Sequence, residues 1–95
     1  MRFSVLVEVT HREGVADPEG ATIERALPAL GFGGVSRVRV GKAIRFELEA
    51  DSEEAARREV EEMCRRLLAN PVIEQASSSV VAAPGPASRA EGGRA

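Results

Sequence analysis

Hydrophobic and polar residues alternate near the start of the chain with the two-residue period of a β-strand. Within residues 2–10, apolar side chains occupy every second position: Phe3, Val5, Val7 and Val9. Within residues 43–50, the same alternation places three apolar side chains on one side: Ile44, Phe46 and Leu48. Because successive side chains of a strand point to opposite faces of its sheet, both segments are predicted to be half-buried strands.

Two further strands are predicted from weaker patterns. Residues 35–40 contain three valines and are predicted to form a strand. They lead into Gly41-Lys42, a dipeptide typical of a tight hairpin turn with glycine first. The pattern therefore predicts a hairpin between residues 35–40 and 43–50. Residues 72–80 form the last predicted strand, which three consecutive serines weaken.

Two segments carry the period of a helix. Asp17-Pro18 is a helix-start signal, Ile23, Leu27 and Leu30 form one apolar stripe, and Gly31 is a stop signal. Pro28 predicts a kink or an irregular last turn, since proline removes a backbone hydrogen bond inside a helix.

The second helix is predicted to begin at a capping box made by Asp51 and Glu54, and to run to about Leu68. Asn70-Pro71 ends it, because the residue before a proline avoids the helical conformation. Its apolar stripe is made of six residues: Ala56, Val60, Met63, Cys64, Leu67 and Leu68.

The resulting order is β-α-β-β-α-β. It predicts an α+β fold, a two-layer α/β sandwich of ferredoxin-like topology with a mainly antiparallel sheet and both helices on one face. The other face is expected to carry mixed charge: Glu8, Arg37, Arg39, Arg45, Glu47 and Glu49. We expect a single domain over residues 1–81 and a disordered Ala/Pro/Gly-rich tail over residues 82–95.

Composition limits the classes of function. The 95 residues include no Trp or Tyr and three Phe, so the predicted core is thin and self-association is expected to add stability. A net charge of −2 argues against nucleic acid as a partner. With no run of 18 apolar residues, no membrane span is expected, and the single cysteine fits a cytoplasmic location.

The chain offers few residues for catalysis. His11 lies in a predicted loop without a nucleophile spaced to join it, and Cys64 lies on an apolar stripe that would raise the pKa of its thiol. No metal-ligand spacing is present. We therefore expect no catalytic residue and no metal site in this chain.

Two polar features have alternative interpretations. The segment Asp17-Pro18-Glu19-Gly20 could hold an anion at a helix start, but its own carboxylates favour a capping role. The cations Arg37, Arg39 and Lys42 either form a basic edge for an acidic partner or nucleotide, or are solvated.

Three blocks in one order carry a family resemblance. They are Asp17-Pro18-Glu19-Gly20, then Val38-Arg39-Val40-Gly41-Lys42, then residues 63–74, which read MCRRLLANPVIE. At these separations the chain resembles the PurS family, the small subunit of phosphoribosylformylglycinamidine (FGAM) synthase, from Arg2 to about Val81.

The resemblance implies a non-catalytic assembly subunit of a purine-biosynthetic ligase complex, which converts FGAR, glutamine and ATP into FGAM, glutamate, ADP and phosphate. It would bridge a large synthetase subunit and a glutaminase subunit, support ammonia transfer and self-associate to a dimer or tetramer. ATP and Mg would be used by the complex, with no cofactor on this chain. Contact or scaffolding roles then fall to seven residues: Arg39, Gly41, Lys42, Asp17, Gly20, Asn70 and Glu74.

Three other classes of protein share such a fold. An ACT-type regulatory module would bind amino acids near the loop after the first strand, which here holds Gly14. An RNA-binding sheet needs exposed aromatic residues, whereas Phe3 and Phe46 are predicted to face the helices. An acylphosphatase-like enzyme needs an anion-cradling loop with arginine and a strand asparagine, and neither is in place.

Overall fold

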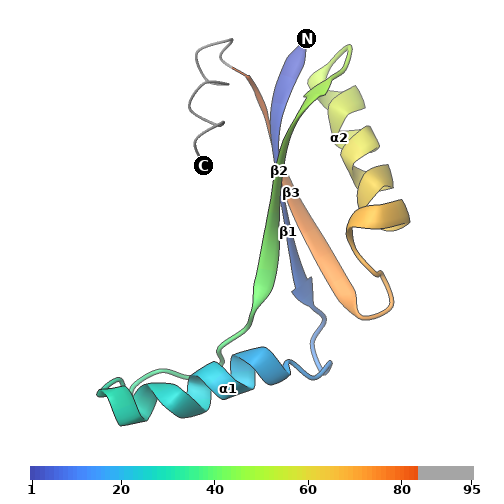
Figure 1. The fold of residues 1–95 in the computed structure, drawn as a ribbon. Coiled ribbons are helices and arrows are strands. Elements are labelled where there is room, and N and C mark those ends of the chain that lie inside the picture. Colours follow the sequence, from blue (N-terminus) through green and yellow to red (C-terminus); the bar gives the residue numbers. More distant parts are fainter. Residues whose placement is uncertain (84–95) are drawn as a thin grey trace.

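The computed structural model describes residues 1–83, which form three strands and two α-helices (Figure 1). The elements in chain order are β1 (Arg2–His11), α1 (Pro18–Ala26), β2 (Gly41–Glu49), α2 (Glu53–Met63) and β3 (Glu74–Ala82). A 3₁₀ turn, η1 (Leu27–Leu30), follows α1, and a π turn, η2 (Cys64–Leu68), follows α2. The α+β class with an antiparallel, ferredoxin-like sheet is confirmed.

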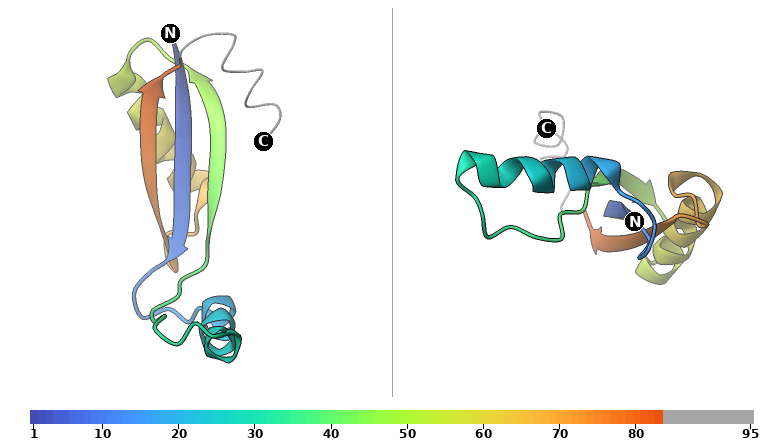
Figure 2. Two further views of the ribbon diagram at one scale, coloured as in Figure 1. Left: turned by 90° about the vertical axis from the view of Figure 1, so that its left-hand side faces the viewer. Right: turned by 90° about the horizontal axis from the view of Figure 1, so that it is seen from below.

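The sheet has the order β2-β1-β3, and both pairs of strands are antiparallel. The predicted face of β1 is confirmed, because its alternate apolar side chains are all buried. Register places Phe3 opposite Leu48 and Val5 opposite Val80, so the three strands share this apolar face. Helix α2 covers it (Figure 2). The core consists of seven residues: Phe3, Val5, Val7, Val9, Ala56, Val60 and Val80.

The predicted strand over residues 35–40 is not formed, so the hairpin prediction was wrong. The observed order within residues 1–83 is β-α-β-α-β, and Gly41 opens β2 opposite Thr10 instead of making a turn. Two features account for this. The amides of Val38 and Val40 donate to the side chains of Glu24 in α1 and of Asp17 at its N-cap, and Arg37 takes a φ of 60°, which interrupts an extended run.

Helix α1 does not pack on its own sheet, contrary to the prediction of two helices on one face. It leaves the end of the sheet at a steep angle and projects sideways (Figures 1 and 2). As a result its apolar stripe is largely in water, with Leu30 70% exposed. Of the two helices in residues 1–83, α2 is the one that covers the sheet.

The helix ends follow the signals in the sequence with one change. Asp17 caps α1, and Gly31 ends η1 with a left-handed φ of 98°. The irregular last turn expected at Pro28 is the 3₁₀ turn η1. The cap of α2 is Ser52, whose hydroxyl accepts from the amide of Ala55, and not the predicted Asp51.

The open face of the sheet carries the predicted mixed charge on its strands. Arg2 lies 3.8 Å from Glu47 and 3.6 Å from Glu49, and Glu8 and Arg45 share the same face by register. Arg37 and Arg39 belong to the 31–40 linker, outside the sheet. Strand β3 begins at Glu74, two residues later than predicted, and includes Ala82. The rest of the predicted tail, residues 84–95, lies outside the described residues, and no helix among those described is long and apolar enough to span a membrane.

Candidate functional site

The three sequence blocks gather at one end of the sheet. β1 ends there at His11, α1 begins there, and β2 starts beside β1 at Gly41. The turn from η2 into β3 reaches the same end, because His11 pairs with Glu74. Segments that are separated by up to about sixty positions in the chain therefore form one junction between the sheet and α1.

Asp17 is the central residue of this junction. One carboxylate oxygen caps α1 by accepting from the amide of Gly20 at 3.0 Å, and the other accepts from the amide of Val40 at 2.8 Å. These two backbone hydrogen bonds, to Val40 first and Gly20 second, lower the pKa of Asp17 below its usual value of 3.8. The capping interpretation is supported, and the same carboxylate also holds the linker before β2.

A second carboxylate of α1 holds the same linker. Glu24 lies seven residues after Asp17, two helical turns along the same face, and accepts from the amide of Val38 at 3.0 Å. Gly20 lies between the two carboxylates, where an added Cβ would come within 2.6 Å of the Val38 carbonyl oxygen. Helix α1 and residues 38–40 are therefore one packed unit. We use the name arm for α1, η1 and the linker of residues 31–40.

Arg39 ties the arm to the end of β1. Its guanidinium donates to the carbonyl oxygen of His11 at 2.5 Å and lies 3.8 Å from Glu13 and 4.0 Å from Asp17. The guanidinium is thus engaged inside this chain, which favours a scaffolding role over a free basic edge. Arg37 is exposed, and Arg39 also keeps 39% of its side chain exposed.

Gly41 is required by close packing at the start of β2. An added Cβ would lie 2.5 Å from the carbonyl oxygen of Val9 and 2.9 Å from the Thr10 methyl carbon. Gly41, Lys42, Asp17 and Glu74 line one open groove of about 370 Å³ next to this point. Four of the seven predicted residues therefore share a groove.

Asn70 and Glu74 are brought together at the turn between η2 and β3. The Glu74 carboxylate accepts from the amide of Asn70 at 2.8 Å, and the Asn70 side chain accepts from the amide of Val72 at 3.1 Å. Arg12 joins this turn to the end of β1, since its Nε donates to the Pro71 carbonyl at 2.9 Å and its amide to Ile73. These contacts are structural.

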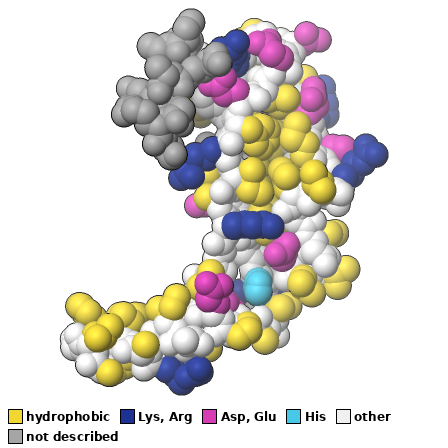
Figure 3. Space-filling model, viewed as in Figure 1, with side chains coloured by type: hydrophobic (Ala, Val, Ile, Leu, Met, Phe, Trp, Pro, Cys, Tyr) yellow, Lys and Arg dark blue, Asp and Glu magenta, His cyan; other side chains and the backbone are white. Residues whose placement is uncertain are grey.

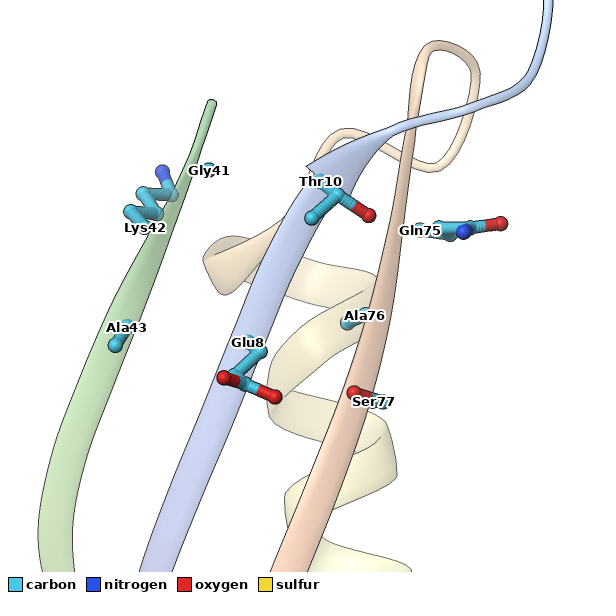
Figure 4. A pocket seen from close by; sticks show the side chains of 8 residues that line it. All are labelled: Glu8, Thr10, Gly41, Lys42, Ala43, Gln75, Ala76 and Ser77. Atoms are coloured by element: carbon cyan, nitrogen blue, oxygen red, sulfur yellow. The ribbon is translucent and has the colours of Figure 1, made fainter. Parts of the chain in front are cut away.

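A second groove lies on the open face of the sheet (Figure 4). Its volume is about 470 Å³, and it is lined by Glu8, Thr10, Lys42, Gln75 and Ser77 among others. Figure 4 shows the side chains of Lys42 and Gln75 pointing outward on the two edge strands, away from Glu8. The groove therefore lacks a set of converging polar groups.

His11 and Cys64 do not form a catalytic set. The His11 ring lies 3.2 Å from the carbonyl oxygen of Ala16, whereas Cys64 is a free thiol packed against the core. Burial, and secondarily the charge of Glu61, raise the pKa of the Cys64 thiol. Among residues 1–83 no cluster of three metal-ligating side chains was found.

Two residues of the junction were not predicted from the sequence. Glu24 had a usable signal, because a seven-residue spacing from Asp17 puts both carboxylates on one helix face. Arg12 had none, since its partners are carbonyl groups about sixty residues away.

The chain matches a known protein family over most of its length. The family model for PurS, phosphoribosylformylglycinamidine (FGAM) synthase, matches residues 4–82. The chain is 48% identical over 71 residues to FGAM synthase subunit PurS of Methanocaldococcus jannaschii, covering 75% of this chain and 86% of that one. It is 51% identical over 71 residues to the subunit from Archaeoglobus fulgidus, covering 75% and 89%.

Solved structures agree with this relationship. The PurS subunit of Thermotoga maritima superposes with a TM-score of 0.79 at 37% identity, over 85% of this chain and 93% of that one. A chain in the structure of PurLQS from the same organism gives a TM-score of 0.79 at 37% identity, over 85% and 99%. The chain described here belongs to the PurS family of FGAM synthase subunits.

Proposed function

We propose that this chain is the assembly subunit that bridges the synthetase and glutaminase subunits of an FGAM synthase complex and supports the transfer of ammonia between them. The observation that carries the proposal is the arm, which is held at one end by Asp17, Glu24 and Arg39 while its apolar stripe is left largely uncovered within residues 1–83. A projecting helix with an uncovered apolar stripe is typical of a surface that contacts another polypeptide.

A second copy of the chain is the proposed cover for this stripe. The arm exposes four apolar side chains: Ile23, Leu30, Phe32 and Val35. The apolar face of β2 is also incompletely covered, since Ile44, Phe46 and Leu48 are only partly buried beside α2. Figure 3 shows apolar side chains gathered next to α2 and again along the arm. In a two-fold dimer, the arm of each copy would cover the exposed apolar face of β2 in the other copy.

The role in ammonia transfer follows from the chemistry of the complex. Ammonia released by a glutaminase is lost to water unless a closed interface confines it, so a subunit without a reaction of its own still controls the yield. ATP and Mg²⁺ are assigned to the synthetase subunit, and this chain is proposed to bind no cofactor. We place the complex in the cytoplasm, in keeping with the single unpaired cysteine.

The test is reconstitution with the two larger subunits. We expect glutamine-dependent FGAM formation to require this chain, and ammonia-dependent formation at high ammonium concentration to continue without it. The second reaction is the control, because it bypasses the transfer step. Equal glutamine-dependent rates with and without the chain would contradict the proposal.

A further inference from the structure

Strand β3 is a long edge strand without the features that usually protect the edge of a sheet. In the order β2-β1-β3, no strand of residues 1–83 binds its outer side (Figure 2). From Gln75 to Ala82 its side chains are uncharged and mostly small, and none is proline. The other edge strand, β2, carries four charged side chains: Lys42, Arg45, Glu47 and Glu49. Since charge and proline are common ways to block an edge, β3 is the edge that is open to a further strand.

The backbone groups that would bind such a strand follow from the register. The amide of Ala83 donates to the carbonyl of Arg2 at 2.9 Å. At the other end, the carbonyl of Ile73 accepts from the amide of Arg12. Odd-numbered residues of β3 therefore direct their backbone groups toward β1, and even-numbered residues direct theirs outward. The outer edge is thus a row of backbone donors and acceptors, which is a template for another extended chain.

One side chain of the same chain reaches this edge. Nη2 of Arg57 lies 3.5 Å from the carbonyl oxygen of Val80, and the same nitrogen is bound to Glu53. Farther along the edge, Ala76 and Ser78 border an open groove of about 320 Å³ beside α2. The middle of the edge is therefore accessible. Arg57 can keep its bond to Glu53 when the Val80 carbonyl takes a new donor.

A second copy of β3 fits this edge in a symmetric register. Ser78 is the middle residue of the nine-residue strand, so a two-fold axis through it overlaps the whole of both strands. Ala76 then pairs with Val80 of the second copy. Glu74, the only charged residue of β3, falls opposite Ala82, so no like charges face each other. The two three-stranded sheets would then form one continuous antiparallel sheet.

The charges on α2 agree with this axis. Arg57 reaches Val80, and α2 runs opposite to β3, so Met63 lies about 9 Å farther along the helix, level with the middle of β3 (Figure 1). Glu61 and Arg65 stand on either side of Met63, and both line the groove beside the free edge. The axis brings Glu61 of each copy toward Arg65 of the other. Within residues 1–83 Glu61 belongs to no ion pair of α2, so this contact gives it a partner.

We propose that two copies of this chain pair through the outer edges of their β3 strands, antiparallel about Ser78. The β3 edge lies on the opposite side of the sheet from β2, which the arm of another copy is proposed to cover. Both contacts can therefore form at once, and together they build a tetramer, a pair of pairs. The strand pairing goes beyond the proposed bridging function and does not depend on it.

Disulfide cross-linking tests the register. Ser78→Cys is made in the full chain after Cys64→Ala has removed the native thiol. At the proposed axis the two Cα atoms of residue 78 lie about 5.5 Å apart, a distance that a disulfide can span. We expect mild oxidation of a dilute solution to convert most of the chain to a covalent dimer.

The matched control is Gln75→Cys in the same background, at another exposed position of β3. Gln75 falls opposite Val81 of the second copy, so this cysteine is far from its own equivalent and should cross-link only slowly. Cross-linking at position 78 that is no faster than at position 75 would overturn the proposed pairing.

Ser78→Pro tests the pairing without a cross-link. It removes an outward-pointing amide at the proposed axis, and an edge strand tolerates proline at such a position, so the far-ultraviolet circular dichroism should match the wild type. Sedimentation velocity should show the tetramer reduced to a dimer, with the dissociation constant of the β3 contact raised at least about tenfold. Ser78→Thr keeps the amide and should assemble like the wild type.

A folded Ser78→Pro chain that keeps the wild-type mass would overturn the inference. If this variant does not fold, the cross-linking result decides. The bridging function fails separately, when glutamine-dependent FGAM formation is equal with and without the chain, and that result leaves cross-linking at position 78 unchanged.

Discussion

The Cα atom of Gly20 lies so close to the carbonyl oxygen of Val38 that an added Cβ would approach that oxygen to 2.6 Å. This contact joins the first turn of α1 to the linker before β2. Asp17 lies on the same side, with its carboxylate 2.7 Å from the added Cβ position. The close packing of α1 against the linker therefore depends on a residue without a side chain.

Gly20→Ala is expected to destabilise the chain and to displace the arm. The new methyl group would meet backbone on one side and a hydrogen-bonded carboxylate on the other, and overpacking of this kind costs about 1–3 kcal/mol. Chemical denaturation measures the loss, and self-association should weaken with it. Gly33→Ala is the control, since an added Cβ there meets nothing within 4 Å. Equal stability of the two variants would contradict the packing described.

Asp17→Asn should alter the dependence of stability on pH. The folded pKa of Asp17 is below 3.8, so its contribution is fully present above that pH and is lost as the pH falls through the folded pKa. The variant should therefore melt a few degrees below the wild type at pH 7, with the gap closing toward pH 2. Thermal melts across this range test it. The control is Asp51→Asn, at an exposed carboxylate, which should leave the thermal midpoint at pH 7 unchanged. A difference in midpoint between Asp17→Asn and the wild type that stays constant with pH would contradict the role of the Asp17 carboxylate.

Leu30→Ser combined with Phe32→Ser should abolish the proposed self-association through the arm. The two side chains are 70% and 56% exposed in the single chain, so its folding should be unaffected. Burying a large apolar side chain contributes about 1.5–3 kcal/mol, so each loss should raise the dissociation constant about tenfold or more. Sedimentation velocity over a range of concentrations measures this. The same distribution for variant and wild type would exclude the arm as the contact.

Val7→Ala is expected to cost about 2 kcal/mol, because a fully buried side chain in the middle of the central strand is shortened and leaves a cavity. Val7 has no exposed surface and is one of seven buried hydrophobic residues in the part of the chain that the structure describes. Val72→Ala, at a side chain that is 79% exposed, is the control and should unfold like the wild type. Equal losses at the two positions would mean that the core has been assigned wrongly.

Alkylation of Cys64 should be several-fold slower in the folded chain than after unfolding at pH 8. Its raised pKa leaves less thiolate, and burial is the main cause. Glu61→Gln removes the second cause, so it should speed the reaction of the folded chain without changing that of the unfolded chain. Iodoacetamide labelling followed by mass spectrometry gives both rates. Rapid labelling of the folded wild type would show that the thiol is accessible and ionised.

Much of the fold could be predicted from local patterns. The two-residue alternation in β1 identified its buried face, and Asp17, Pro28 and Gly31 marked the start, the irregular turn and the end of the first helix. Five of the predicted site residues lie in or beside the sheet–α1 junction, and Asn70 and Glu74 form the turn next to it.

The errors share one cause. The three valines of residues 35–40 favour a strand, but residue type does not say which groups accept from the backbone amides. Here the acceptors are the carboxylates of Asp17 and Glu24, 23 and 14 residues earlier. Likewise, the apolar stripe of α1 predicted that this helix would be buried, but not which surface would cover it. The stripe of α2 could not reveal that a π turn would expose Leu67.

The sequence by itself determined which side of each strand is apolar, where the helices begin, and the three blocks that mark the family. These properties depend on near neighbours and on the geometry of one element. Only the tertiary structure decided that the arm leaves the sheet, that the three blocks meet at one end of it, and that Leu67 faces water. Those outcomes depend on hydrogen bonds and packing between segments far apart in the chain, which no local period encodes.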